Sequence, residues 1–135
     1  MKLGATTTVT INTKEVLKKI DQATRLGLRD TIVLIHNEAV KESPVLTGNN
    51  RRSLHSEVSG MGPAQNVGGR QAGDTWTSGA RVVDDKKLEA AFYSTSGYGG
   101  DLEVGTSRMR AQPYIIPARD KHLPGLAKKI ESHMK

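Results

Sequence analysis

The side chains with the most obvious chemical potential are the four histidines, His36, His55, His122 and His133. No two of them have the HxH or HxxxH spacing that places two imidazoles on one face of a strand or helix. A lone histidine is more often an ordinary buried or surface residue than a metal ligand. We therefore predict no metal site.

An adjacent acidic pair, Asp84–Asp85, is the obvious candidate for acid/base chemistry. Neighbouring side chains diverge on an extended chain, and two lysines follow at once, so the sequence DDKK predicts a solvated turn. The paired glycines of Asn66–Arg70 lack the lysine and the strand-to-helix context of a phosphate-binding loop. The chain has no cysteine and no Gly-x-Ser-x-Gly. We predict no catalytic residue, no cofactor and no enzymatic activity.

Composition narrows the class of protein further. The chain has 135 residues, of which 36% are hydrophobic and only 4% aromatic, and its net charge is +6. No apolar run approaches the roughly 18–20 residues of a membrane span, and the start of the chain lacks the apolar core of a secretory signal. We expect neither. This length and composition predict one globular domain over residues 1–135.

The positive charge is concentrated near the C-terminus. Residues 104–135 carry 7 basic and 2 acidic side chains. Basic charge favours acidic partners, so a small nucleic-acid-binding protein is the alternative hypothesis. The few aromatic residues argue against base stacking. The candidate phosphate contacts are Arg51, Arg52, Arg108, Arg110, Arg119, Lys128 and Lys129.

These residues need elements to position them, and the first is a long helix. Asn12 is a suitable N-cap, with Glu15 three residues later, and apolar residues then recur at helical spacing as far as Ala39. A single helix bent near Gly27 and two helices both fit this pattern. Pro44 ends the helical segment, since the residue before a proline avoids helical angles.

The rest of the chain predicts a sheet followed by short helices. The order favours an α+β fold, in which a long N-terminal helix packs on an antiparallel β-sheet and short C-terminal helices follow. The Gly-rich stretch Gly60–Gly79 predicts a flexible loop that is disordered in the free monomer. The expected strands are residues 5–11, Leu54–Ser59, Ala80–Val83, Leu88–Ser94 and Asp101–Val104, and Asp84–Lys87 is expected to be a charged hairpin turn between the third and the fourth of them. The expected helices are Pro113–Lys121 and Pro124–Met134.

Three segments together resemble a known family. The first is Ser43-Pro44-Val45-Leu46-Thr47-Gly48 with Arg51, Ser53 and Leu54, directly after the predicted helix. The second is Leu102-Glu103-Val104-Gly105-Thr106, and the third is Gln112-Pro113-Tyr114-Ile115-Ile116-Pro117-Ala118. In this order they are similar to the small neck and tail-completion proteins of long-tailed bacteriophages, also described as minor tail components. Leu46 replaces an acidic residue of the family pattern, Asn50 replaces a leucine, and Val104 and Tyr114 replace phenylalanines.

The resemblance implies a structural protein of the virion that performs no chemistry. Such proteins form rings, commonly six-fold, at the joint between the head and the tail. The implied partners are further copies of the chain, neighbouring connector or stopper proteins, and tail-terminator or tail-tube proteins. Non-specific contact with DNA in the channel is a further implication. The implied location is the neck of the virion, after assembly in the host cytoplasm.

The motif residues also have physical roles without the family. Pro44 breaks the helix, and Gly48 permits a turn with positive φ. Gly105 is expected to end a strand, where the Thr106 hydroxyl bonds backbone donors. Pro113 and Pro117 fix φ in the return of the chain, so we interpret the motifs as determinants of the fold. The expected interface residues are Arg70, Trp76, Arg108, Arg110, Arg119, Lys128 and Lys129, with the Gly-rich loop and the Thr-rich N-terminus.

Overall fold

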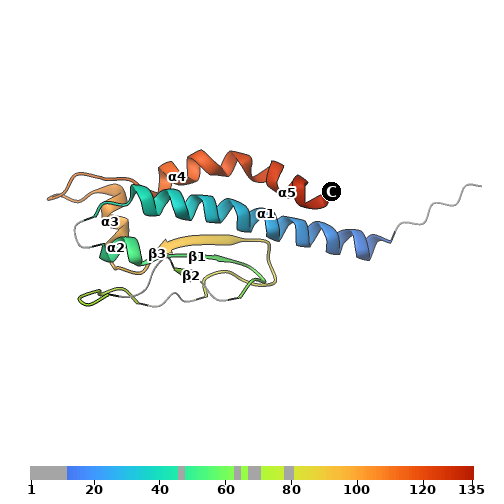
Figure 1. Ribbon diagram of the computed structural model, residues 1–135, viewed down its shortest axis with the longest axis horizontal. Coiled ribbons are helices and arrows are strands. Elements are labelled where there is room, and N and C mark those ends of the chain that lie inside the picture. The colour runs from blue at the N-terminus through green and yellow to red at the C-terminus, as the bar shows by residue number, and fades with distance from the viewer. Residues whose placement is uncertain (1–11, 46–47, 63–64, 67–70, 78–80) are drawn as a thin grey trace, which may run out of the picture.

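The computed structural model describes residues 12–45, 48–62, 65–66, 71–77 and 81–135 (Figure 1). It confirms the predicted α+β fold, in which a long N-terminal helix packs on an antiparallel sheet and short helices follow. The elements are α1 (Thr13–Glu42), α2 (Asn49–Arg52), β1 (Leu54–Val58), β2 (Gln65–Asn66), β3 (Ala90–Ser94), α3 (Gly99–Val104), α4 (Ile115–His122), the 3-10 helix η1 (Leu123–Gly125) and α5 (Leu126–Met134).

The beginning and end of α1 follow from local signals. The Glu15 backbone N–H donates to Asn12 Oδ1 at 3.1 Å, and the Asn12 amide donates back to Glu15 Oε2 at 3.3 Å. This reciprocal cap confirms the predicted start. Ser43 is extended, with ψ at 130°, directly before Pro44. The helix is continuous through Gly27, so the single-helix reading is correct, and its 30 residues span about 45 Å.

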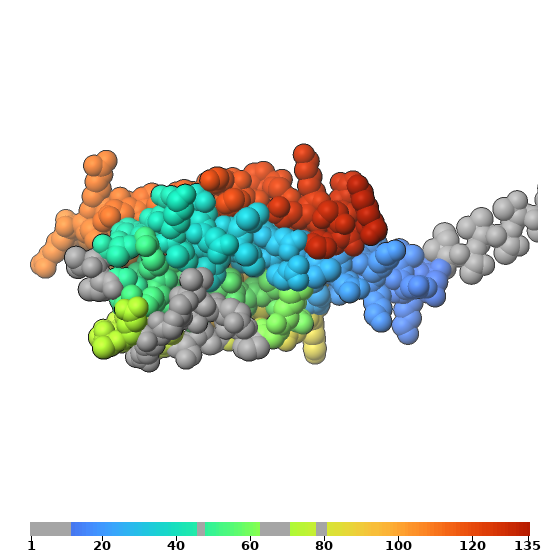
Figure 2. Space-filling model, in the orientation of Figure 1, coloured from blue at the N-terminus to red at the C-terminus, as the bar shows by residue number. Residues whose placement is uncertain are grey.

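Helix α1 lies between the sheet on one side and the C-terminal helices on the other (Figure 1). Helix α5 approaches α1 closely at Gly27, where a Cβ would lie 2.9 Å from Ile130 Cα. A glycine is therefore needed for the close packing of the two helices. The first turns of α1 extend beyond the sheet and beyond α5, so the molecule is elongated (Figure 2).

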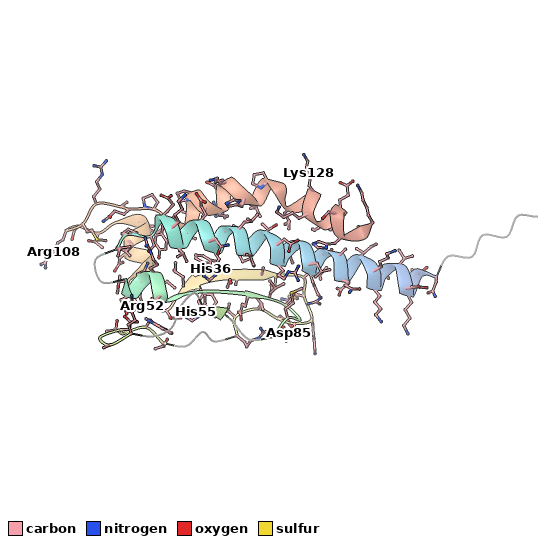
Figure 3. All side chains as sticks on the ribbon, in the orientation of Figure 1. His36, Arg52, His55, Asp85, Arg108 and Lys128 are labelled. Carbon is pink, nitrogen blue, oxygen red and sulfur yellow. The ribbon has the colours of Figure 1, made fainter. Side chains whose placement is uncertain are left out.

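The sheet has the strand order β2-β1-β3, and both pairings are antiparallel. Leu54 and Val58 of β1 face α1, while His55 lies on the opposite face (Figure 3). On that opposite face the Trp76 ring packs edge-on against His55 at 5.9 Å between centroids, and the N–H groups of Val82 and Val83 donate to the Glu57 carboxylate. The core between α1, β1 and α4 consists of Ile32, Ile35, Ala39, Leu54, Val58, Tyr114 and Ala118.

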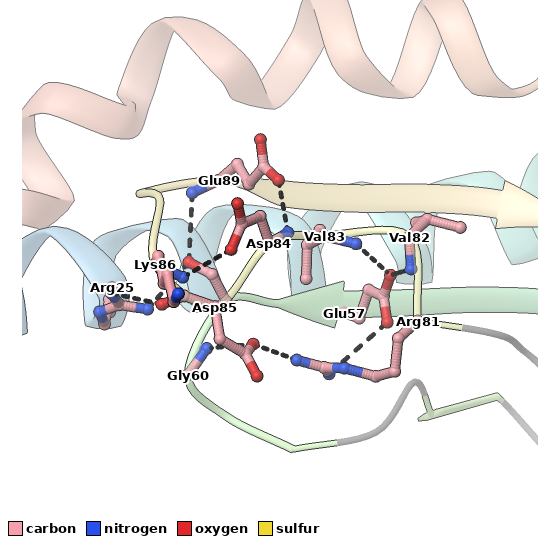
Figure 4. A network of polar contacts seen from close by, with 11 residues as sticks. Arg25, Glu57, Gly60, Arg81, Val82, Val83, Asp84, Asp85, Lys86 and Glu89 are labelled. Carbon is pink, nitrogen blue, oxygen red and sulfur yellow. Dashed lines mark hydrogen bonds and ion pairs between the residues drawn. The ribbon is translucent and has the colours of Figure 1, made fainter.

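Two of the predicted strands are wrong. Asp101–Val104 is the end of helix α3, and its Glu103 carboxylate binds backbone N–H groups at the start of α4. Residues 81–83 of the predicted strand Ala80–Val83 are irregular, because the N–H groups of Val82 and Val83 donate to the Glu57 carboxylate rather than to a neighbouring strand (Figure 4).

The acidic pair after residue 83 forms a turn, as predicted. Lys87 N–H donates to the Asp84 carbonyl at 3.0 Å, and Asp85 is exposed. The turn leads into β3 without forming a two-stranded hairpin, and it is held at the end of the sheet by Arg25 of α1. The Arg25 guanidinium donates to Ser59 Oγ at 2.9 Å and to the Asp85 carbonyl at 3.1 Å (Figure 4).

Part of the Gly-rich loop is held against the rest of the protein. Asp74 forms an ion pair with Arg52, with 2.8 Å between Arg52 Nε and Asp74 Oδ2, and this contact holds the pKa of the carboxyl well below its usual range. Thr75 N–H donates to Asn49 Oδ1 at 2.8 Å. Loop flexibility stays a prediction for residues 60–79 as a whole, and limited proteolysis with first cleavage inside this stretch would test it.

Candidate functional site

The first motif forms the turn that follows α1, and Asn50 is its centre. The Asn50 side-chain oxygen accepts hydrogen bonds from the hydroxyls of Ser94 and Ser96, both at 2.8 Å. Its Nδ2 donates to Ser43 Oγ at 3.1 Å. Asn50 is only 3% exposed. A polar network therefore occupies the position where the family pattern has a leucine.

Two other residues of this motif close the end of α1. Gly48 has φ at +82°, as predicted for the turn. The Arg51 guanidinium donates to the carbonyls of Ser43 at 2.8 Å and Lys41 at 3.2 Å, so it binds the carbonyl end of the helix. Thr47, also predicted as a motif residue, lies outside the described residues.

The second motif binds the third through Glu103. The Glu103 carboxylate accepts N–H groups from Tyr114 at 2.7 Å, Ile115 at 2.9 Å and Ile116 at 2.8 Å. Unpaired N–H groups and the positive end of the dipole make a helix start a site for a carboxylate, so Glu103 caps α4 from a distance in sequence. The buried Tyr114 hydroxyl donates to the Gly99 carbonyl at 3.1 Å.

The chain between these two motifs is a tight projection. Gly105 has φ at +81° and ends helix α3, whereas the sequence predicts that it ends a strand. The Thr106 hydroxyl accepts the Arg108 N–H at 3.3 Å, as predicted for a backbone donor. Gln112 N–H donates to the Leu102 carbonyl at 2.8 Å and closes the projection.

The remaining motif residues belong to the return of the chain and to the turn after β3. Pro117 lies in the first turn of α4, which tolerates the missing N–H, and Ala118 is buried in the core. Pro113 precedes the helix and is exposed. Ser53 is buried and bonds the Ser94 hydroxyl at 2.8 Å. Through these contacts the motif residues hold the fold together, in line with their interpretation as determinants of the fold.

All three motif segments meet at one open cleft of about 470 Å³. This end of the molecule, with the turn after α1, helix α3 and the projection after it, is called the motif end below. The described lining offers amide, phenol and apolar groups and no carboxylate, imidazole, lysine or arginine, which suits binding by shape and hydrogen bonds. The lining residues are Pro44, Val45, Gly48, Asn49, Asn50, Tyr98, Leu102, Met109 and Gln112.

The opposite end of the molecule is the start of α1, residues 13–22, which we call the free end. It extends past the other elements (Figure 2). Val16 is 47% exposed, Leu17 60% and Ile20 38%. Three large apolar side chains, each more than one-third exposed, thus lie on two helical turns and form a surface suited to a partner.

The predicted basic interface residues do not form one surface. Arg108 and Arg110 are exposed on the projection at the motif end, and neither forms an ion pair within the described parts of the chain (Figure 3). Arg119 pairs with Asp120 on α4 at 3.1 Å. Lys128 is exposed and Lys129 half-buried on α5, far from the projection in the ribbon (Figure 1).

Trp76 and Arg70 complete the set of predicted interface residues. Trp76 is 7% exposed and its Nε1 donates to Asp74 at 2.9 Å, so its assignment to the surface is wrong. The Trp76 indole packs against His55, so the second face of the sheet is buried as well. Arg70 lies outside the described residues.

Sequence reasoning missed the buried polar groups beside β1. His36 of α1 bonds Ser56 Oγ at 2.8 Å, and burial, together with the charge of His55, lowers the pKa of His36 to about 4. Glu57 is buried beneath Arg81. The alternation in Leu54–Ser59 does place His55 and Glu57 on one face, but nothing local shows that this face is covered. Within the described residues no group of three potential ligands could hold a metal ion.

Comparison with protein-family models, curated proteins and solved structures finds no match to this chain. Among the helices that the structure describes, none combines the length and the hydropathy that crossing a membrane requires. The phage resemblance therefore depends on the three motif segments and their contacts.

Proposed function

We propose that this chain is a structural virion protein of the tail-completion type, which forms a ring at the head–tail joint between the connector complex and the tail tube. The convergence of the three motif segments on one cleft carries this proposal. Asn50 joins the first motif to the turn after β3, and Glu103 joins the second motif to the third. Segments that are separate in the sequence thus form one unit.

The shape supports a ring of identical copies. The motif end offers a cleft lined by amide, phenol and apolar groups beside an arginine-bearing projection, and the free end offers exposed apolar side chains. Two unlike ends favour head-to-tail contacts, which close into a ring when the rotation between copies allows it. Neighbouring rings of connector, terminator or tube proteins are the other partners under this proposal.

We expect the genes that flank this one to encode capsid, portal and tail proteins, and co-expression of the chain with those proteins tests the proposal. We expect negative-stain microscopy to show rings or joined particles, and unjoined heads and tails when the chain is omitted. Leu17→Asp at the free end removes the joining, whereas Gln22→Asp, which adds the same charge at an exposed polar position, leaves it intact. A chain that stays monomeric and never enters particles contradicts the proposal.

Binding of nucleic acid is the second candidate, favoured by the exposed arginines of the projection, Arg108 and Arg110, which form no ion pair with the residues that the structure describes. Arg108→Ala with Arg110→Ala is expected to weaken DNA binding and to reduce the slope of log affinity against log salt by about 2. Arg119→Ala is the control, because Arg119 already pairs with Asp120. Absence of binding at low salt removes this candidate.

A further inference from the structure

Strand β3 is an edge of the sheet, and part of its backbone is free. Thr95 N–H donates to the Ser53 carbonyl at 3.1 Å, and Ser59 N–H donates to the Glu89 carbonyl at 2.9 Å. In an antiparallel ladder such bonded pairs alternate, so Ala90 and Phe92 direct their N–H and C=O groups away from β1. Within the described chain none of these four groups has a hydrogen-bond partner. A free edge of this kind can accept another strand.

An apolar groove of about 260 Å³ runs beside this edge. Ala90 and Phe92, the residues with free backbone groups, also line the groove with their side chains. A strand paired with β3 would therefore place every second side chain over the groove. The other walls come from α1 and from the C-terminal helices, with Leu28, Ile32, Ile115, Leu123 and Leu126 among the lining residues.

One segment of this chain has a matching pattern. Residues 5–11, Ala-Thr-Thr-Thr-Val-Thr-Ile, lie outside the described residues, and their sequence predicts a strand. Alternation places Val9 and Ile11 on one face and three threonines on the other. The apolar face suits the groove, and the threonine face suits contact with water.

The two apolar residues of this segment, Val9 and Ile11, cannot reach the groove of their own copy. The chain enters α1 at Thr13, and Leu28, at the near end of the groove, lies 15 residues further along the helix, which is about 22 Å. An extended chain advances at most about 3.5 Å per residue, so Val9 reaches only about 14 Å from Thr13 and Ile11 about 7 Å. The groove that these residues fit must belong to another molecule.

We propose that residues 5–11 of one copy pair with the β3 edge of a second copy, with Val9 and Ile11 in its groove. Each copy then gives one strand and receives one. The contact is heterologous and continues from copy to copy until a ring closes. The inference takes its partner, a second copy, from the ring proposed above, but it concerns association of the isolated protein and is tested separately.

Sedimentation velocity and native mass spectrometry of the full chain test the donated strand. We expect the wild type to form oligomers, and Val9→Asp with Ile11→Asp to weaken self-association about a hundredfold, because two carboxylates would enter an apolar groove. Thr8→Asp with Thr10→Asp is the matched control. It adds the same charge on the other face and is expected to keep the oligomers.

The receiving edge is tested by Ala90→Pro. Proline is tolerated at the first residue of an edge strand, and here it removes an N–H that has no partner within the described part of the monomer. We expect a monomer with an unchanged unfolding midpoint. Mixing Ala90→Pro with the Val9→Asp/Ile11→Asp variant pairs an intact donor with an intact acceptor, so heterodimers and nothing larger should form.

Hydrogen exchange on the wild type gives a readout that does not depend on the folding of any variant. The amides of Ala90 and Phe92 are expected to exchange fast at low concentration and to become protected as oligomers form. The inference is overturned if the protein stays monomeric and these amides exchange fast up to millimolar concentration. It is also overturned if the Val9→Asp/Ile11→Asp variant associates as strongly as its Thr8→Asp/Thr10→Asp control. If rings still form at the head–tail joint with these substitutions, the strand exchange is wrong and the proposed function stands. If oligomers form but never enter particles, the proposed function is wrong and the strand exchange stands.

Discussion

The two ends of this molecule reverse the usual distribution of polar and apolar groups. At the motif end, Asn50 and Glu103 are 3% and 9% exposed. At the free end, Leu17 is 60% exposed and stands among other bare apolar residues. Buried polar groups that are fully bonded specify one arrangement of the chain, whereas exposed apolar groups gain free energy only when a partner covers them. The difference separates residues that build the protein from residues that are available to other molecules.

Removing the cap of α4 should break the motif end most severely. Glu103→Ala leaves three N–H groups without their acceptor, and we expect the free energy of unfolding to fall by about 3 kcal/mol. Urea denaturation measures the change. Asp101→Ala, on the same helix but exposed, is the control and should change stability by less than about 0.5 kcal/mol. Equal effects of the two substitutions would contradict the capping role.

Restoring the leucine of the family pattern should also destabilise this protein. Asn50→Leu removes the shared acceptor of the Ser94 and Ser96 hydroxyls, which keep hydrogen bonds to each other and, for Ser94, to Ser53. We expect a loss of about 2 kcal/mol in urea denaturation. Adding Ser94→Ala and Ser96→Ala removes the hydroxyls that lost this acceptor and should recover part of the loss. A more stable Asn50→Leu variant would show that the polar network is dispensable.

Acid should weaken the buried part of α1 through His36. Its pKa is about 4 in the folded protein and about 6.5 in the unfolded chain, so below pH 6.5 the unfolded chain binds the proton first. Stability is therefore complete above pH 6.5 and falls as the pH drops towards 4. Between pH 7 and pH 5 we expect a loss of about 1.5 kcal/mol from this group. His36→Gln should remove that part of the pH dependence in urea denaturation.

Changes at the free end should have the smallest effect on folding and a large effect on assembly. Leu17→Asp is expected to change the free energy of unfolding by less than about 0.5 kcal/mol, because the side chain is 60% exposed. Thermal unfolding measures the change in stability, and negative-stain microscopy of joined particles measures the effect on assembly. A large loss of stability would show that the free end belongs to the fold of the single copy.

Local signals in the sequence predict α1 and β1 well. The cap at Asn12, the stop before Pro44 and the positive φ at Gly48 each depend on residues within a few positions. The overall layering follows because a 30-residue amphipathic helix needs a sheet or other helices to cover its apolar side.

The errors share one cause, which is a partner far away in the sequence. Asp101–Val104 alternates like a strand, but its helix is fixed by the contact of Glu103 with residues 114–116. Val82 and Val83 have strand-forming side chains, but their N–H groups bind Glu57, some 25 residues earlier. The sequence places Trp76 at the surface because nothing in its own segment shows that it covers His55.

The candidate site was predictable to a similar degree. The three motifs are visible in the sequence, and their meeting at one cleft is a property of the folded chain. The free edge of β3 and the groove beside it depend on which strand ends the sheet, and strand order has no local signature.

Helix α1 is continuous, so the number of residues between its two ends fixes how one end is rotated relative to the other about the helix axis. Each residue of a helix turns the chain by about 100°, so one residue inserted between Gln22 and Ala23 would rotate the free end about the helix axis by that angle. In the proposed ring, the direction in which a copy holds its neighbour through the free end would thus be set by helical phase. In a closed assembly that direction determines how many copies complete the circle, so ring size would be encoded in the residue count of one helix.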